Sequence, residues 1–171
     1  MPLYTLSANI EIMFPKTMPR HERMEVAAAL GMKAFSFRGV GNEEEKAMLV
    51  VQKRTGLRCA SIAGSGRIGW TSGLTKPGFE QAYLDVITEN CGVARRFGGA
   101  DLIVFAGEVH RDIPWETQRR QVVTGLRKAG DIAQKHSVYL CLEPRNRVES
   151  PKMSVLSARG ARLSRRRRNR M

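Results

Sequence analysis

The stretch that decides the fold is Val138-Tyr-Leu-Cys-Leu-Glu-Pro-Arg-Asn146. Its apolar first half contains a β-branched and an aromatic residue, and it predicts a short buried strand that runs up to a carboxylate. Pro144 has no N–H to donate to a neighbouring strand, so the strand is expected to end there. In parallel α/β folds, the loops after the carboxyl ends of the strands form the pocket. Glu143 is therefore the first candidate catalytic residue, and a merely solvated glutamate is the alternative.

Upstream of this strand, strand and helix patterns alternate with short connections. Strands are expected at 3–14, 33–37, 57–63, 101–106 and 138–142, and helices at 20–30, 42–55, 79–97 and 114–135. The glycine-rich segment 64–78 is expected to be a flexible loop over the mouth of the sheet. Strict alternation indicates parallel strands with helical crossovers, because a hairpin cannot join parallel neighbours.

Two architectures fit this order: a closed eightfold barrel and a doubly wound open sheet. A complete barrel takes about 250 residues, whereas this chain of 171 residues offers four βα units and a fifth strand. We therefore expect a partial (β/α)8 TIM barrel over residues 1–158. Residues 159–171 lose all apolar periodicity, which predicts a disordered, Arg-rich tail. The abrupt change in composition favours an altered reading frame over a designed tail.

The positive charge of the chain is concentrated at its C-terminal end. The net charge is +13, but residues 145–171 carry ten of the 29 Lys and Arg and one of the 16 acids, which leaves +4 on the first 144 residues. Arg165–Arg168 would contact nucleic-acid phosphates in a salt-dependent way. No aromatic residue follows Tyr139, so the tail has no stacking platform for single strands. The composition of this tail therefore predicts nonspecific contact with nucleic acid and no sequence-specific binding.

Cysteine usage and hydropathy give no sign of secretion or of a membrane. Cys59, Cys91 and Cys141 are widely spaced within apolar patterns, which predicts buried, reduced thiols with neither a zinc nor a disulfide framework. No apolar run approaches the roughly 20 residues that cross a bilayer. A cytoplasmic location is expected.

Several motifs together resemble a known family. The segments are 7–14, 98–107, 126–138 and Leu142-Glu-Pro-Arg-Asn146. They are similar to hydroxypyruvate isomerase, within the xylose isomerase-like TIM-barrel group of sugar isomerases, epimerases and endonuclease IV-type enzymes. The resemblance covers residues 5–158, about the first two-thirds of such a barrel. It implies an isomerase of the aldose–ketose type, which interconverts hydroxypyruvate and tartronate semialdehyde by proton transfer through an enediolate. The implied substrate is a small hydroxy-oxo acid or sugar.

The same resemblance assigns roles at the fifth strand. It implies that Glu143 is the catalytic acid/base and a ligand of a divalent metal, Mg²⁺ or Mn²⁺, and that Asn146 orients it. The chain departs from the family in having Ser36 where relatives commonly place a glutamate, and Arg145 where an apolar residue is usual. The second carboxylate and the remaining metal ligands of the family come from later strands. We therefore expect impaired activity in this chain.

Three other residues are candidates for the site. Trp70 is predicted either to cover a small substrate or to pack on its own loop, and His110 to contact substrate at the rim, with a surface histidine as the alternative at even odds. Glu11 is a weaker rim candidate than Glu143. The Gly64–Gly69 segment fits the G-x-G-x-x-G pattern of dinucleotide sites, but no helix is expected to follow it, which argues against that function.

Two functions from different classes therefore remain open. The first is an isomerase built on Glu143. The alternative is a non-catalytic, basic, nucleic-acid-associated protein with endonuclease IV-like ancestry. The second predicts binding that falls steeply with salt and disappears when residues 159–171 are deleted.

Overall fold

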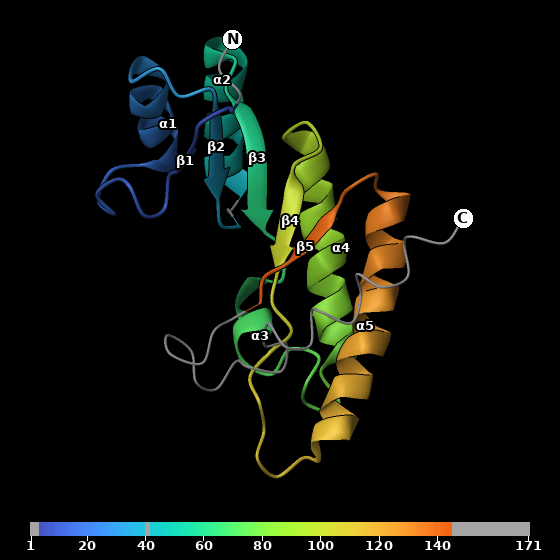
Figure 1. The fold of residues 1–171 in the computed structure, drawn as a ribbon. Helices are drawn as coiled ribbons and strands as arrows, with labels where there is room; N and C mark the ends of the chain where they lie inside the picture. Colours follow the sequence, from blue (N-terminus) through green and yellow to red (C-terminus); the bar gives the residue numbers. More distant parts are fainter. Residues whose placement is uncertain (1–3, 40–41, 145–171) are drawn as a thin grey trace.

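The computed structural model describes residues 4–39 and 42–144, which form one parallel sheet with a layer of helices on one side (Figure 1). The strands follow the order of the sequence: β1 (Ser7–Asn9), β2 (Ala34–Phe37), β3 (Arg58–Ala63), β4 (Asp101–Val104) and β5 (Leu140–Leu142). The helices are α1 (Arg20–Ala29), α2 (Asn42–Thr55), α3 (Gly66–Trp70), α4 (Glu80–Arg96) and α5 (Trp115–Lys135). Within the described ranges, no helix combines the length and the apolar composition that crossing a bilayer requires.

The strand order separates the two architectures left open by the sequence. Each strand pairs in parallel with the next one along the chain, from β1 to β5. A doubly wound sheet reverses its order at a switch point, and this sheet has no reversal. The predicted partial TIM barrel, with four βα units and a fifth strand, is confirmed. The predicted Arg-rich tail lies outside the described residues.

The two outermost strands are shorter than predicted. At the first, the Asn9 carbonyl accepts the N–H groups of Ile12 and Met13 at 3.2 and 3.1 Å, so a turn replaces the expected second half of the strand. At the fifth, the N–H of Val138 still bonds to the carbonyl of Ala133 at the end of α5. In both places, hydrogen bonds within a turn occupy backbone N–H and carbonyl groups that a longer strand would have needed for pairing with its neighbour.

The sheet has one buried and one half-buried face, because consecutive residues of a strand point in opposite directions. The helix layer covers the face that carries Phe35, Ile62 and Leu102, all fully buried. The other face, which lines the inside of the incomplete barrel, carries a row of polar residues in register: Asn9, Ser36, Ser61 and Asp101. A bulge after Phe35 brings Ser36 opposite Ser61. The core therefore lies outside the barrel, and the inside is left half-buried and polar.

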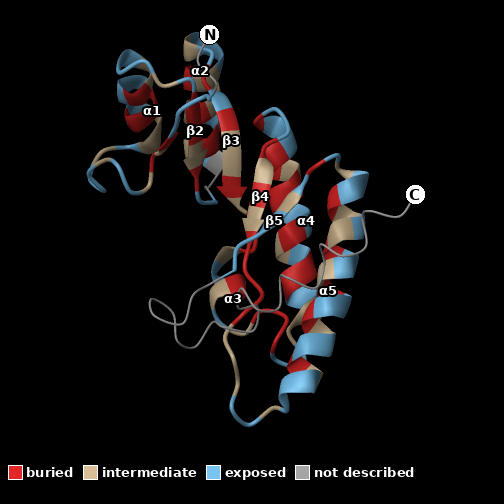
Figure 2. Cartoon of the chain, in the orientation of Figure 1, coloured by how far each residue is buried: buried red, intermediate tan, exposed pale blue. Residues whose placement is uncertain are grey.

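Helix α4 supplies the centre of that core. Its side chains Tyr83, Ile87, Cys91 and Ala94 are fully buried at helical spacing. Beyond its last turn, the ring of Phe97 lies 4.9 Å from that of Phe37 and 6.1 Å from that of Phe35. Figure 2 shows the burial along α4, whereas the outer side of α5 is exposed. The amphipathic pattern of the sequence predicted this helix correctly.

The segment 64–78 is held in place, so the prediction of a flexible loop is wrong. It contains helix α3, and its backbone bonds directly to the chain that follows β4: Leu74 donates to Ala106 at 2.7 Å, and Glu108 donates to Thr71 at 2.8 Å. The side chain of Ser65 also accepts the N–H of Phe105 at 3.0 Å. These contacts join residues far apart in the sequence, which is why local composition did not reveal them.

Gly73 is the tightest point of this attachment. It has a φ of +48°, and a Cβ at this position would lie 2.2 Å from the carbonyl oxygen of Ala106. We expect Gly73→Ala to lower the free energy of unfolding by about 1 to 3 kcal/mol, because it adds both backbone strain and a clash. Urea denaturation followed by circular dichroism measures this change.

Gly130 provides the matched control, because a Cβ there meets nothing within 4 Å and the residue lies within α5. Gly130→Ala should leave the stability unchanged or raise it by up to about 1 kcal/mol. Equal effects of the two substitutions would contradict the close approach at Gly73.

The three cysteines differ in exposure. Cys59 and Cys91 are buried as predicted, but Cys141 is exposed, because within the described residues β5 has a strand neighbour on one side only. Burial raises the pKa of the Cys59 thiol to about 12. Burial, and after it the negative charge of Asp101, raises the pKa of Cys141 above its ordinary value.

Iodoacetamide should therefore modify Cys141 first in the native protein. The thiolate is the reactive form, so the raised pKa predicts slow labelling at neutral pH and a rate that still climbs as the pH passes 9. Peptide mass spectrometry after short exposures reads the three sites separately. Labelling of Cys59 or Cys91 as fast as Cys141 would contradict this order of burial.

Candidate functional site at the carboxyl ends of the strands

A small pocket lies where all five strands end. Its volume is about 220 Å³, and each strand or the residue after it contributes to its wall: Asn9, Ser36, Ser61, Ile103 and Glu143. We call it the mouth pocket. The arrowheads of β2, β3 and β4 in Figure 1 point toward this end of the molecule, where α3 also lies. Parallel pairing thus gathers polar side chains from distant parts of the sequence at one rim.

Glu143 follows β5 directly and lines the mouth pocket, as its place in the sequence predicted. Its N–H donates to the carbonyl of Val104 at 3.0 Å, which extends the pairing of β4 and β5 by one bond. The residue is exposed, so its side chain is accessible to a small molecule. Asn146 and Arg145, the other residues of the motif that were singled out, lie outside the described residues.

Trp70 lies at the mouth pocket, and its aromatic partner comes from outside its own loop. It ends α3, and its ring lies 4.3 Å from the ring of Phe105 with an interplanar angle of 42°. It also lines the mouth pocket together with Glu143. Packing against Phe105 therefore fixes the indole at the edge of the pocket.

Glu11 also borders the mouth pocket, but it is held by arginines. Arg20 donates to its carboxylate at 2.6 Å, the guanidinium of Arg23 lies 3.8 Å away, and the N–H of Arg38 donates to it at 3.2 Å. Burial alone would raise the pKa of the Glu11 carboxyl, but the hydrogen bonds and charges of these groups outweigh burial and lower it. A carboxylate held in its ionised form is a weak proton acceptor, so Glu11 is better suited to fixing this corner of the fold.

His110 is not brought to the mouth pocket. The buried side chain of Gln118 accepts its N–H at 3.0 Å and donates to its carbonyl at 2.7 Å. These two hydrogen bonds hold the loop between β4 and α5 in its conformation. Within the described part of the chain, the buried Nε2 of His110 has no hydrogen-bond partner. His110 is thus absent from the residues that line the mouth pocket, whereas Glu143 is among them.

The described residues do not form a divalent-metal site by themselves. Mg²⁺ and Mn²⁺ prefer several oxygen ligands, yet no group of three His, Cys, Asp or Glu side chains in residues 4–39 and 42–144 is placed to hold an ion. The carboxylates at the mouth pocket are Glu11 and Glu143, and Glu11 is engaged by Arg20.

A second pocket adjoins the first and was missed by the sequence analysis. It has a volume of about 580 Å³ and is lined by Arg38, Gly39, Ala63, Gly66, Arg67 and Trp70. We call it the arginine pocket. Arg38 comes directly after β2, and this position at the rim was the available signal. The sequence analysis considered only the net charge of the first 144 residues, +4, which does not reveal a local group of arginines.

The glycines beside this pocket have a packing explanation. Contrary to expectation, a helix does begin at Gly66, but it spans five residues only. A Cβ at Gly64 would lie 2.5 Å from the Cβ of Leu102, and one at Gly69 would lie 2.1 Å from the hydroxyl of Ser65. Two glycines of the dinucleotide-like pattern thus allow close contact within the protein.

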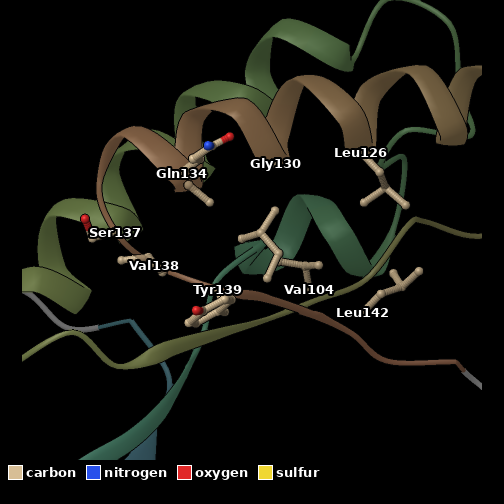
Figure 3. A pocket seen from close by; sticks show the side chains of 10 residues that line it. Val104, Leu126, Gly130, Gln134, Ser137, Val138, Tyr139 and Leu142 are labelled. Atoms are coloured by element: carbon tan, nitrogen blue, oxygen red, sulfur yellow. The ribbon is translucent and has the colours of Figure 1, made fainter. Parts of the chain in front are cut away.

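A larger pocket than these two lies elsewhere, on the helix side of the sheet (Figure 3). Its volume is about 740 Å³, and its wall is formed by α5 on one side and by β4 and β5 on the other. Leu126, Val138 and Leu142 make it mostly apolar, and no ionisable carboxylate lines it. The titratable side chain that lines it is the phenol of Tyr139, whereas the mouth pocket offers the carboxylate of Glu143, so the mouth pocket is the better catalytic candidate.

Comparison with known proteins places this fold in a family. The family described as the xylose isomerase-like TIM barrel matches residues 24–155. No curated protein sequence matches the chain. Similar solved structures include AP endonuclease, family 2 from Brucella melitensis, with a TM-score of 0.78, 20% sequence identity, and coverage of 95% of this chain and 64% of that one.

Two sugar epimerases are also similar in structure. They are 3-keto-D-glucoside 4-epimerase from E. coli (TM-score 0.67, 18% identity, 84% of this chain and 57% of that one) and D-allulose 3-epimerase from Methylomonas sp. (TM-score 0.61, 16% identity, 82% and 51%). The chain thus spans less than two thirds of each of these three proteins, and at such identities the likeness concerns the fold. Because the family match covers most of the chain and the strand order agrees with it, the chain belongs to the xylose isomerase-like TIM-barrel family.

Proposed function

We propose that this protein is an isomerase or epimerase of small sugars or hydroxy-oxo acids, in which Glu143 transfers a proton between neighbouring carbons. The observation that carries the proposal is the position of Glu143, at the end of β5 and in the wall of the mouth pocket. Solved relatives of similar fold include a D-allulose 3-epimerase in complex with D-allulose and a D-psicose 3-epimerase with D-tagatose. These relatives favour a sugar-like substrate for this chain.

Within this class, we propose hydroxypyruvate and tartronate semialdehyde as the substrate pair. The support is the resemblance of Leu142-Glu-Pro-Arg-Asn146 to hydroxypyruvate isomerase. Interconversion removes a proton from the hydroxyl-bearing carbon beside the carbonyl and returns it to the former carbonyl carbon. A single carboxylate at the pocket wall is suited to the first of these two transfers.

The polar row inside the barrel suits the charge that develops during proton removal. An enediolate concentrates negative charge on two neighbouring oxygens, and hydrogen-bond donors placed beforehand lower the barrier to forming it. Ser36, Ser61 and Asn9 supply neutral donors on the same face, next to Glu143. Trp70 at the edge of the pocket would shield the reacting carbons from water. In the same proposal, Asn146 orients Glu143.

A divalent metal and a second carboxylate are further parts that the family resemblance implies. Glu143 would be one ligand of such a metal, which would supply positive charge opposite the developing enediolate. The other ligands would have to come from outside the described residues. Proton removal by Glu143 is therefore the step of the reaction that we expect from the described residues without a metal or a second carboxylate.

Hydrogen–deuterium exchange tests that step without requiring complete isomerisation. In D₂O, the full chain should speed the loss of the proton NMR signal of the hydroxymethyl group of hydroxypyruvate relative to buffer. Glu143→Gln should reduce the catalysed part of the rate about 100-fold or more, because general base catalysis contributes on that scale.

Glu108→Gln is the matched control, because Glu108 follows the neighbouring strand β4 and does not line the mouth pocket. Its exchange rate should equal that of the unmodified chain. A Glu143→Gln protein with unchanged exchange, or an unmodified chain no faster than buffer, would overturn the proposed function.

A further inference from the structure

We propose that Arg38 and Arg67 form a binding site for an oxyanion, a carboxylate or a phosphate carried by the small substrate. The inference rests on the proposed function, because it takes the anionic group to belong to a molecule whose carbon chain extends to Glu143. Within the sugars and hydroxy-oxo acids proposed above, it favours the anionic ones and assigns their anionic group to two named side chains.

The first argument is the composition of the arginine pocket. Two of its six lining residues are arginines, and none is acidic. Both arginines are exposed, and neither guanidinium makes an ion pair or a hydrogen bond with any described residue. Two planar groups with several N–H donors each can hold a carboxylate or phosphate through paired hydrogen bonds.

The second argument is the contrast with the nearby arginines. Arg20 pairs with Glu11 and Glu44, and the buried Arg23 donates to the backbone carbonyls of Met18, Ile10 and Lys16. These two side chains stabilise the fold and have little positive charge to offer a ligand. Their positive charges balance the negative charge of the Glu11 carboxylate, so Glu11 does not offset the positive charge of the Arg38 guanidinium.

The third argument is that both arginines extend from a fixed backbone. The N–H of Arg38 donates to the Glu11 carboxylate at 3.2 Å, which anchors the chain just after β2. Arg67 belongs to α3, the short helix of the segment that is bonded to the chain after β4. A binding site with its backbone set in advance loses less entropy on binding than one on a free loop.

The fourth argument is the continuity of the two pockets. Arg38, Ala63 and Trp70 line both the arginine pocket and the mouth pocket. An oxyanion between the guanidiniums would therefore leave the rest of a short molecule in the mouth pocket, beside Glu143. A neutral sugar has no group that matches two unpaired arginines.

Three probes with the same three-carbon skeleton test the site by equilibrium binding: D-glycerate, glycerol 3-phosphate and glycerol. Isothermal titration at fixed ionic strength measures affinity without turnover, so the result is independent of catalysis by Glu143. We expect D-glycerate or glycerol 3-phosphate to bind roughly ten-fold or more tightly than glycerol, and the stronger of the two identifies carboxylate or phosphate as the preferred group.

Arg38→Gln and Arg67→Gln should each weaken binding of the preferred anion by roughly five-fold or more. Arg58→Gln is the matched control, because Arg58 is also exposed but begins β3 at the opposite rim. It should leave the affinity unchanged. Unchanged thermal unfolding of the variants shows that the fold is kept.

Equal affinity for all three probes would overturn the proposal, because it would mean that the anionic group is not recognised. Equal weakening by Arg58→Gln and Arg38→Gln would overturn it too, because it would mean attraction to net charge only. Retained affinity in either pocket variant would overturn it as well. The proposed function can fail separately: anion binding by the unmodified chain that depends on Arg38 and Arg67, without catalysed proton exchange, would leave this site standing and remove the isomerase.

Discussion

Parallel pairing of neighbouring strands is the constraint on which the rest of the structure depends. Because each connection crosses over through a helix, every strand enters the sheet at the same rim and leaves at the other. The helices bury one face of the sheet, with Phe35 and Leu102 in the core. The opposite face does not pack against the helices and carries Asn9, Ser36 and Ser61. The packed core and the polar row that leads to the candidate site thus lie on different faces of the same five strands.

Helices α1, α2, α4 and α5 were predicted from the sequence, because they depend on local signals, whereas the strand order decided between the two open architectures only in the structure. Gly31 and Pro114 mark helix ends, and α1 ends at Ala29 while α5 begins at Trp115. The segment 64–78 was misjudged for the opposite reason. A glycine can indicate a flexible turn, but it can also allow another segment of the backbone to approach closely. The two cases are told apart only by the residue that contacts the glycine, which can be distant in the sequence. At Gly73 that partner is Ala106, more than thirty residues away along the chain.

The candidate site was predicted in part. The positions of Glu143 and Trp70 follow from the rule that strand ends form the pocket, and both line it. His110 satisfies the same rule but is drawn aside by Gln118, a contact that no pattern in the sequence reveals. Arg38 and Arg67 were overlooked because charge was averaged over the body. Arg20 and Arg23 pair with other groups, whereas no described residue forms an ion pair with Arg38 or Arg67, which line the arginine pocket.

The edge of β5 has a consequence for handling the protein in solution. In the described part of the chain, β5 pairs with β4 on one side, and its other side has no strand beside it. A row of unpaired amide and carbonyl groups is a template for another strand. At high protein concentration, this row should nucleate intermolecular β-sheet, and the exposed thiol of Cys141 on the same strand would then cross-link neighbouring molecules under oxidising conditions. Dilute, reducing buffers should therefore keep the chain monodisperse.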